Sequence, residues 1–466
     1  MVALDRSAVI LRARGSLELR CLLDGTDGSH VQKAVSGAFE RVRAGVTSQA
    51  LVFRVHDSPM FIWPNKGCQA TEGIAETTAC KDLLQRLRSG EPDGGKRSSK
   101  KKDKRNGDTS IINIDLLMEL TEPGREAGPT LTRREARHHL AQMALPMDCV
   151  VMAGMDDGIG DALSRLVGAV CSQLTDMESV VLRHISGTSL LVPQPFHFLL
   201  PEPTGLVTLV YPAGVPDTQL ESFRKEMHVR FALPEDRPYL RRANANHFLG
   251  EPFKDAYLRN PHLALSHPAL EDAKPFLVQG VYSYHHYMQD RVDDSGWGCA
   301  YRSLQTICSW FQQQGYTERV VPSHKEIQQA LVDVGDKPSS FVGSRQWIGS
   351  IEVQAVLDQL LGITSRILFV SQGSELVNQG RELASHFQRE GTPIMIGGGV
   401  LAHTILGVLW SETTGDIRFL ILDPHYTGGE DVQVIIDKGW CGWKGMDFWD
   451  QRAYYNLCLP QRPKAI

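Results

Sequence analysis

The chain has 466 residues, of which 42% are hydrophobic and 22% are charged, and its formal net charge is -5. This composition excludes a disordered or fibrous protein, and the slightly acidic balance gives no reason to expect direct nucleic-acid binding. The first residues, Met1–Arg6, are too charged for a secretory signal, and no uncharged apolar run approaches the ~18 residues of a membrane span. We therefore expect no transmembrane segment and roughly two to three domains.

Nine cysteines are scattered along the chain, and no two of them have C-x-x-C spacing. A disulfide framework or a structural zinc site is therefore not expected, and free thiols indicate a reducing compartment. We expect no cofactor and no bound metal.

The first part of the chain, residues 1–185, mixes strand-like and helical patterns, which predicts an α/β module. Its strand-like runs are 51–55 and 111–117, and its helical patterns end near Leu87 or span 132–143 and 159–175. Within this module, seven of the ten residues 96–105 are Lys or Arg. We expect a disordered, solvated loop at about 89–110, with a nuclear-import or acidic-surface patch as the alternative.

Residues 186–275 are expected to form a second unit or an extension of the first, and residues 205–210 within them predict a strand. From 276 to 466 aromatic residues become dense, and turn residues delimit the elements more clearly. One helix is expected to start at Cys299, a second to have Ser350 as its N-cap and to end at Gly362, and a third to cover about 375–389. The expected strands cover 393–396, 400–409 and 417–422.

Cys299 follows a glycine-rich stretch and stands at the start of a helical pattern of apolar residues. A thiol at a helix N-terminus lies at the positive end of the helix dipole, which favours the nucleophilic thiolate. Cys308 lies nine residues further on, two and a half turns away, and shares the apolar stripe with Leu304 and Phe311. We therefore expect Cys308 in the core and Cys299 as the nucleophile of a cysteine hydrolase.

A histidine and a carboxylate must complete such a site. Asp423 and His425 are two residues apart after the strand-like run 417–422, so in an extended segment their side chains leave the same face. One nitrogen of His425 can then meet Asp423 while the other faces the thiol. His403, in the preceding strand-like run, is the alternative base, because Cys299, His403 and Asp423 follow the chain order of papain-like enzymes.

The oxyanion that forms in such a reaction needs hydrogen-bond donors. The backbone N–H of Cys299 at the helix start is one of them. A second is expected from the segment 282–287, Tyr-Ser-Tyr-His-His-Tyr, although aromatic residues of this kind more often serve packing.

The segments around these residues resemble the ubiquitin-fold-modifier-specific cysteine proteases. The resemblance lies in Tyr287, in Asp293-Asp294-Ser295-Gly296-Trp297-Gly298-Cys299-Ala300-Tyr301-Arg302, in Asp423-Pro424-His425, and in the C-terminal stretches 440–445 and 454–460. The Gly-Trp-Gly-Cys and Asp-Pro-His pieces also occur in the more distant autophagin proteases. These motifs cover about residues 280–466, and the length of the preceding part points to the larger member of the family.

The resemblance implies an α+β protein with a papain-like cysteine protease domain at 276–466, in which the catalytic order is Cys, Asp, His. It implies that Cys299 is the nucleophile and that His425 is the base and acid. Asp423 then orients His425, and Tyr287 donates to the oxyanion.

The family removes a short tail after a glycine of the modifier precursor and cleaves the isopeptide bond that joins this glycine to a lysine. Both reactions transfer a glycyl group through a thioester, so one site can serve both. A tail that ends in glycine suits a narrow groove. Trp297 and Trp347 are expected to wall this groove, with ordinary packing as the alternative.

In the larger family member the N-terminal region resembles an MPN-type fold that binds partners. Active MPN metalloproteases hold zinc with an H-x-H pair, and this chain contains none. The resemblance therefore implies a metal-free, MPN-like α/β region that recruits the enzyme to an adaptor protein at the endoplasmic reticulum membrane. The modifier and its conjugates are the other expected partners, and the expected locations are the cytoplasm, the endoplasmic reticulum surface and the nucleus.

Two other functions are compatible with the sequence. The long N-terminal half also suits a binding scaffold whose catalytic domain is idle, and the same triad can pass an acyl group to an amine in place of water. Labelling of Cys299 by a probe built on the modifier tail tests the first alternative, and product analysis tests the second.

Overall fold

The computed structural model divides into two compact units: unit 1 is Met1–Leu220 with Asn246–Leu249, and unit 2 is Glu221–Ala245 with Gly250–Ile466. It describes residues 8–24, 27–48, 50–58, 60–62, 75–89, 111–118, 138–248, 251, 253 and 255–466. The range 186–275, expected as a second unit or an extension, is thus shared between the two units. The basic segment 96–105 lies outside the described residues.

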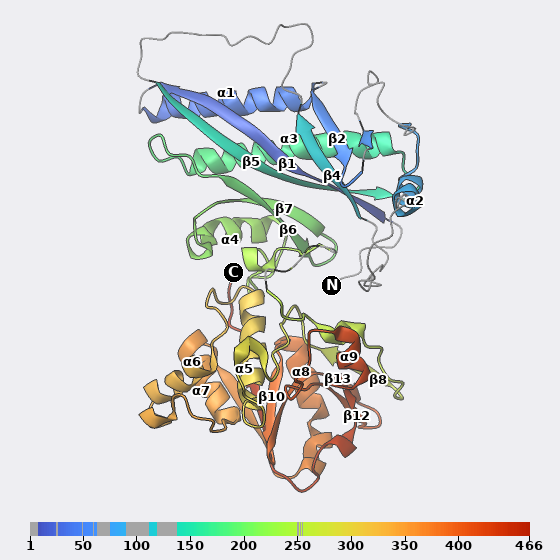
Figure 1. The fold of residues 1–466 in the computed structure, drawn as a ribbon, viewed down its shortest axis with the longest axis vertical. Helices are drawn as coiled ribbons and strands as arrows, with labels where there is room; N and C mark the ends of the chain where they lie inside the picture. Colours follow the sequence, from blue (N-terminus) through green and yellow to red (C-terminus); the bar gives the residue numbers. More distant parts are fainter. Residues whose placement is uncertain are drawn as a thin grey trace. The chain divides into compact units, whose positions relative to one another are not determined.

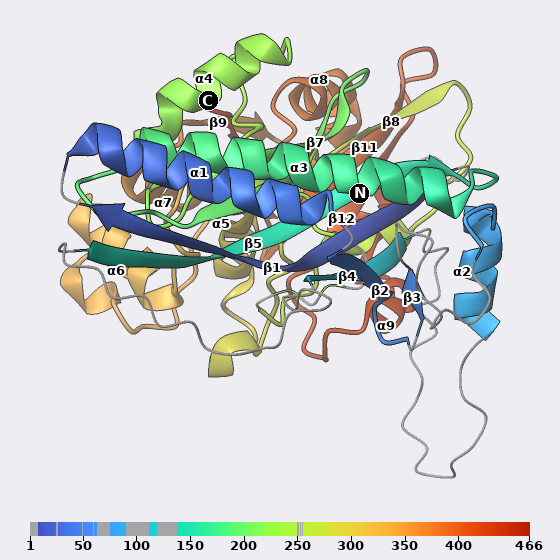
Figure 2. The ribbon, with the colours of Figure 1, turned by 90° about the horizontal axis from the view of Figure 1, so that it is seen from above.

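Unit 1 contains the elements β1 (Ala8–Asp24), α1 (Gly28–Val46), β2 (Leu51–Val55), β3 (Phe61–Ile62), α2 (Cys80–Ser89), β4 (Ile111–Met118), β5 (His138–Gly154), α3 (Ile159–Arg183), β6 (Pro193–Leu200) and β7 (Gly205–Pro212). Five strands form a sheet in the order β3-β2-β4-β1-β5, and β6 pairs separately with β7. β1 pairs antiparallel with the whole of β5 and parallel with β4. Helices α1 and α3 lie side by side against one face of the sheet (Figure 1, Figure 2) and enclose the core with it.

Most predicted elements of unit 1 are confirmed, but one is wrong. The helix expected at 132–143 is strand β5 from His138 onward. Every second side chain from Met143 to Cys149 is buried in the core. This period of two, together with pairing to β1 along all of β5, outweighs the helical pattern. The helix predicted at 159–175 is present and extends to Arg183.

Unit 2 contains the helices α4 (Glu221–Arg230), α5 (Cys299–Gln313), α6 (His324–Asp333), α7 (Ser350–Leu361), α8 (Gly380–Arg389) and α9 (Val432–Asp437), and the strands β8 (Ala273–Leu277), β9 (Ser365–Val370), β10 (Ile394–Gly398), β11 (Leu401–Ser411), β12 (Ile417–Leu422), β13 (Cys441–Lys444) and β14 (Tyr455–Pro460). The strands follow the order β13-β12-β11-β10-β14-β9, and β8 pairs with β11. All of these pairs are antiparallel, so the predicted α+β architecture is confirmed.

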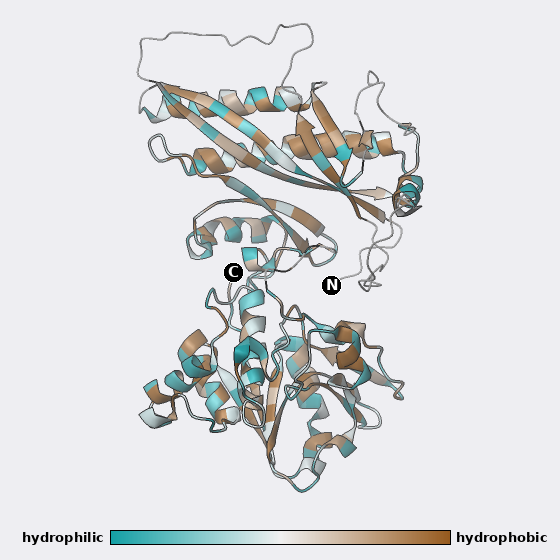
Figure 3. Ribbon diagram, in the orientation of Figure 1, coloured by the Kyte–Doolittle hydropathy of each residue, from teal (hydrophilic) through white to brown (hydrophobic). Residues whose placement is uncertain are grey.

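Hydrophobic clusters cover both faces of the sheet in unit 2. Leu420 and Leu422 of β12 pack into a cluster with α5 and α7, whereas Phe419 and Ile421 pack into a second cluster with α8. β11 and β12 are buried along nearly their whole length, and brown segments mark apolar stretches of the strands in Figure 3. Every residue of α5 from Ala300 to Phe311 is buried, which fixes the helix that begins at Cys299.

The helices and strands predicted for 276–466 are present, with small differences at their ends. Gly349, and not Ser350, occupies the N-cap position of α7, and Ser350 Oγ instead donates to the carbonyl of Asn456 at 2.8 Å. Gly362 ends this helix in the left-handed conformation that favours glycine, with φ of 65°. Among the described residues, no helix is both long and apolar enough to cross a bilayer. The likeness of unit 1 to MPN-type folds stays a prediction.

Candidate active site

Cys299 is the first residue of α5, and a buried ion pair holds the loop before it. The carboxylate of Asp294 is fully buried, and its Oδ2 lies 2.6 Å from Nε of Arg302, which is equally buried. Gly298 fits closely against it, because a Cβ at this position would lie 2.6 Å from the Cβ of Asp294. Asp294 and Gly298 of the short motif before the thiol therefore both have a structural role.

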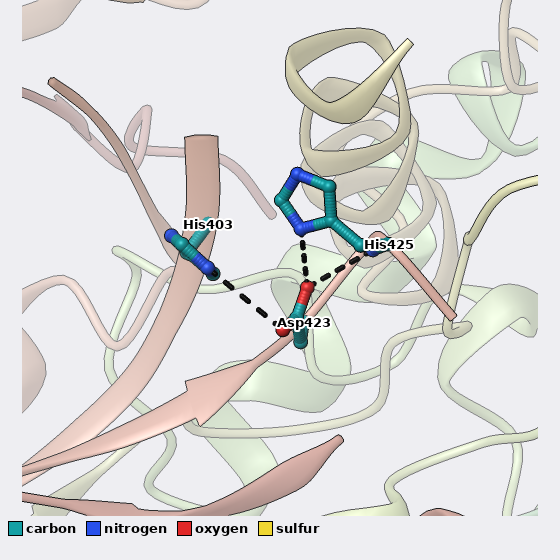
Figure 4. Close-up of side chains that lie close together, drawn as sticks. All are labelled: His403, Asp423 and His425. Atoms are coloured by element: carbon teal, nitrogen blue, oxygen red, sulfur yellow. Dashed lines mark hydrogen bonds and ion pairs between the residues drawn. The ribbon is translucent and has the colours of Figure 1, made fainter. Parts of the chain in front are cut away.

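Asp423 and His425 meet just beyond the end of β12. Oδ1 of Asp423 accepts from the backbone N–H of His425 at 3.0 Å and lies 2.5 Å from its Nδ1 (Figure 4). The pairing expected from their spacing is present, but the chain forms a turn at Pro424 and His425 and not an extended segment. Nε2 of His425 points away from the carboxylate and is buried without a partner at regular hydrogen-bond geometry.

The electrostatics of this site favour a thiolate beside an imidazolium. Burial works against the imidazolium, but Asp423 and Cys299 outweigh it and raise the pKa of His425 to about 9. Burial also works against the thiolate, but His425, the backbone N–H of Ala402 and the hydroxyl of Tyr287 hold the pKa of Cys299 below its ordinary value. The contact from Nε2 to the sulfur is looser than a regular hydrogen bond, as is common in enzymes without substrate.

Tyr287 brings a protonated hydroxyl to the same thiol. This hydroxyl contacts both the side chain and the backbone N–H of Cys299, and burial together with the charge of Cys299 raises the pKa of Tyr287. Its ring meets that of His425 edge to face, with centroids 5.3 Å apart, and its backbone N–H donates to the carbonyl of Pro424 at 3.0 Å. Of the three tyrosines in 282–287, the structure thus brings this one to the thiol, while the other two are fully buried.

His403, the alternative base, lies on β11 on the other side of Asp423. Its Nε2 is 3.8 Å from Oδ2 of Asp423 (Figure 4), and burial lowers its pKa to about 4. The rings of Phe448 and Trp449 pack against it, with centroids 5.1 Å and 6.2 Å away. His403 is therefore a covered, neutral side chain that contacts the carboxylate.

Among the described residues, one group of His, Cys, Asp and Glu side chains lies close enough together to hold a metal ion. It consists of His403, Asp423 and His425. Their nearest ligand atoms all lie within 4.8 Å of one another. However, Nδ1 of His425 and Oδ1 of Asp423 already satisfy each other. This pairing fits proton transfer at a thiol and uses the atoms that a metal would need.

The structure also describes three other residues that the sequence singles out. Cys308 is a core thiol whose pKa burial raises to about 12. Trp347 is 55% exposed, and its indole N–H donates to the carbonyl of Gly296 at 3.2 Å, three residues before Cys299. Trp297 is partly buried and belongs to the same loop. Both indoles therefore lie beside the stretch that leads into the thiol.

Two contributors to the site were not predicted from the sequence. The backbone N–H of Ala402 acts on the Cys299 sulfur, and a backbone group leaves no signal in a sequence. Arg302 is the second, and its signal was available, because an arginine inside an apolar helix predicts a buried ion pair.

Known proteins with similar sequences or folds cover nearly the whole chain. A family model described as "Ubiquitin-fold modifier 1 specific protease 2, N-terminal" matches residues 36–253, and one described as "Peptidase family C78" matches residues 273–458. "Ufm1-specific protease 2" of Homo sapiens is 55% identical over 469 residues, covering 100% of both chains. The Danio rerio protein of the same name is 66% identical over 397 residues, covering 85% of this chain and 99% of the relative.

A solved structure is similar as well. The crystal structure of UfSP from C. elegans has a TM-score of 0.70 and 31% sequence identity, covering 98% of this chain and 78% of that chain. Together with the match at 273–458, this likeness confirms the predicted papain-like α+β fold of the C-terminal part.

Proposed function

We propose that this chain, which belongs to the Ufm1-specific protease 2 family of cysteine proteases, processes the precursor of the ubiquitin-fold modifier at its C-terminal glycine. The same site would release the modifier from lysines of conjugated proteins. The observation that carries the proposal is the Asp423–His425 pair beside the thiol of Cys299, with the hydroxyl of Tyr287 on the same sulfur.

The first half of the proposed reaction forms a thioester. The thiolate of Cys299 attacks the glycyl carbonyl carbon, so a C–S bond forms and the carbonyl electrons move to oxygen. The hydroxyl of Tyr287 and the backbone N–H of Cys299, which contact each other beside the sulfur, are the donors that we propose for this oxyanion. When the C–N bond breaks, the imidazolium of His425 gives its proton to the leaving amine.

The second half returns the enzyme to its starting state. His425, now neutral, takes a proton from water, whose oxygen attacks the thioester carbonyl, and the C–S bond then breaks. Asp423 holds Nδ1 throughout, so Nε2 is the nitrogen that moves the proton. Tail removal and isopeptide cleavage differ only in the leaving amine, and the acyl group is a glycyl group in both.

The exposed indole of Trp347 and the neighbouring Trp297 support a groove for the modifier tail next to Cys299. Large side chains on both sides would admit glycine and reject branched residues. We further propose that the N-terminal region binds an adaptor at the endoplasmic reticulum membrane and that the enzyme works in the cytoplasm, at that membrane surface and in the nucleus. These proposals about location rest on the family resemblance.

Incubation of the full chain with modifier precursor tests the proposed activity. Wild-type protein and Cys308→Ala should remove the tail, because Cys308 lies in the core, whereas Cys299→Ala should not. Cleavage that persists in Cys299→Ala would refute the proposal. Mass spectrometry of the products separates hydrolysis from transfer to an amine, and a dominant amide product would favour an acyltransferase.

A further inference from the structure

Glu430, five residues after His425, connects three segments of unit 2 around the active site. Its Oε1 accepts from Nε2 of His286 at 2.9 Å and from Nε2 of Gln289 at 2.7 Å, and its Oε2 accepts from the backbone N–H of Leu258 at 3.2 Å. Burial works against ionisation, but these hydrogen bonds hold the pKa of Glu430 below its ordinary value. A carboxylate thus stands where the three segments meet.

His286 extends this connection to the residues next to Tyr287. Its ring is 1% exposed, and its Nδ1 lies 3.1 Å from the backbone carbonyls of both Tyr287 and Tyr426. The two ring nitrogens of His286 thus contact Glu430 on one side and the backbone carbonyls of Tyr287 and Tyr426 on the other. His286 therefore joins Glu430 to the residues that adjoin Tyr287 and His425.

Further bonds join the Tyr287 segment to the loop that carries His425. The backbone N–H of Tyr287 donates to Pro424, and the hydroxyl of Tyr284 donates to the carbonyl of Asp423. With the contacts of His286 and Glu430, these bonds form a continuous hydrogen-bond network from Asp423 to Glu430. The position of the Tyr287 hydroxyl therefore depends on the loop that also positions the base.

The Tyr287 segment needs such tethers because its backbone is strained. Three residues that follow Tyr287 have positive φ without being glycine: Met288 (66°), Asp290 (59°) and Arg291 (60°). Side chains other than glycine disfavour this conformation, so it persists only where surrounding contacts impose it. Asp294, in the loop before α5, accepts from the backbone N–H of Met288, and Arg302 of α5 donates to Asp290. Glu430 holds the same segment through Gln289.

We propose that Glu430 is a positioning residue of the active site, which keeps the hydroxyl of Tyr287 on Cys299 by holding the strained segment against the His425 loop. The inference rests on the donor role of Tyr287 in the proposed function. Glu430 itself touches neither the sulfur nor the base, so its whole effect should pass through Tyr287.

A double-mutant cycle on the reactivity of Cys299 tests this chain of contacts. The rate of alkylation of Cys299 by iodoacetamide, followed by mass spectrometry of its peptide from pH 5 to about 10, reports the thiolate. Tyr287→Phe and Glu430→Ala should each move the alkylation profile to higher pH by about half a unit to one unit, which slows alkylation about three- to tenfold at pH values below the pKa of the thiol. In the Tyr287→Phe background, Glu430→Ala should then change nothing.

Two further variants serve as controls. Glu430→Gln keeps an acceptor for His286 without the charge, so its alkylation rate should lie between those of wild type and Glu430→Ala. If the alanine variant does not fold, Glu430→Gln takes its place in the test. Glu390 is a partly buried glutamate of the same unit that accepts the backbone N–H of Arg462 at 2.8 Å. Glu390→Gln should leave alkylation unchanged.

An additive loss in the double variant would overturn the proposal, because Glu430 would then act without Tyr287. Unchanged alkylation in Glu430→Ala would overturn it as well. The assay needs no protein substrate, so a chain that fails to cleave modifier precursor refutes the proposed function and still allows this test. If the precursor is cleaved, Glu430→Ala should lower kcat about tenfold with KM little changed.

Discussion

The two histidines beside Asp423 provide the sharpest test of the active-site assignment. Burial lowers the pKa of His403 to about 4, whereas Asp423 and Cys299, acting against burial, raise that of His425 to about 9. The difference of about five corresponds to roughly 7 kcal/mol in the free energy of protonation at 1.36 kcal/mol per pKa unit. A proton taken from Cys299 should therefore go to His425 by a wide margin.

Replacing each histidine in turn should show this difference in pKa as a difference in the rate of precursor cleavage. His425→Ala should lower kcat/KM on modifier precursor by roughly a thousandfold or more, as loss of a triad member does. His403→Ala should lower it less than about tenfold among folded molecules. That substitution also opens a cavity beside Phe448 and Trp449, which should cost roughly 2–4 kcal/mol of stability.

The assay must separate folding from chemistry. Urea unfolding of each variant gives the folded fraction, and His403→Asn, which keeps a polar contact toward Asp423, provides a better-folded comparison. The reverse ranking, with His403→Ala thousandfold slower and His425→Ala nearly active at equal folded fractions, would refute the assignment. The order of catalytic residues along the chain would then be that of papain.

Three other results are expected. The value of kcat/KM should rise with pH as Cys299 ionises, at a lower pH than an ordinary thiol requires. It should fall near pH 9 as His425 loses its proton. Activity that still rises above pH 10 would contradict the ion pair. Arg302→Met leaves the buried carboxylate of Asp294 without its guanidinium partner, with His324 as the remaining side-chain contact, so urea unfolding should show a loss of roughly 3–5 kcal/mol in the free energy of unfolding. Trp347→Ala should raise KM for the precursor by up to about tenfold with kcat and melting temperature unchanged, because the indole is 55% exposed; an unchanged KM would remove it from the groove.

Local features of the site could be predicted from the sequence because they depend on few residues. The start of α5 at Cys299 follows from a break at Gly298 and an apolar period of 3.6. The meeting of Asp423 and His425 follows from their separation of two, although a turn produces it and not the expected extended backbone. In both cases the information lies within one short window.

Features that depend on distant segments could not be predicted in this way. Glu430 meets His286 across 144 positions of sequence, and no period or motif joins them. The helix expected at 132–143 failed for the same reason, since β5 is fixed by its pairing with β1 more than a hundred residues earlier. The positive φ at Met288 is likewise imposed by tertiary contacts, because methionine has no preference for that conformation.

The sheet register explains why spacing alone did not choose between the two histidines. Thr404 of β11 pairs with Leu422 of β12, so the next position along brings His403 beside Asp423 across the strands. A histidine at this position could serve the carboxylate as the papain order requires. Here Phe448 and Trp449 cover it, and burial keeps it neutral, while the turn after β12 carries His425 toward the thiol. Burial, which a single sequence does not state, therefore decides which neighbour of Asp423 can exchange protons with Cys299.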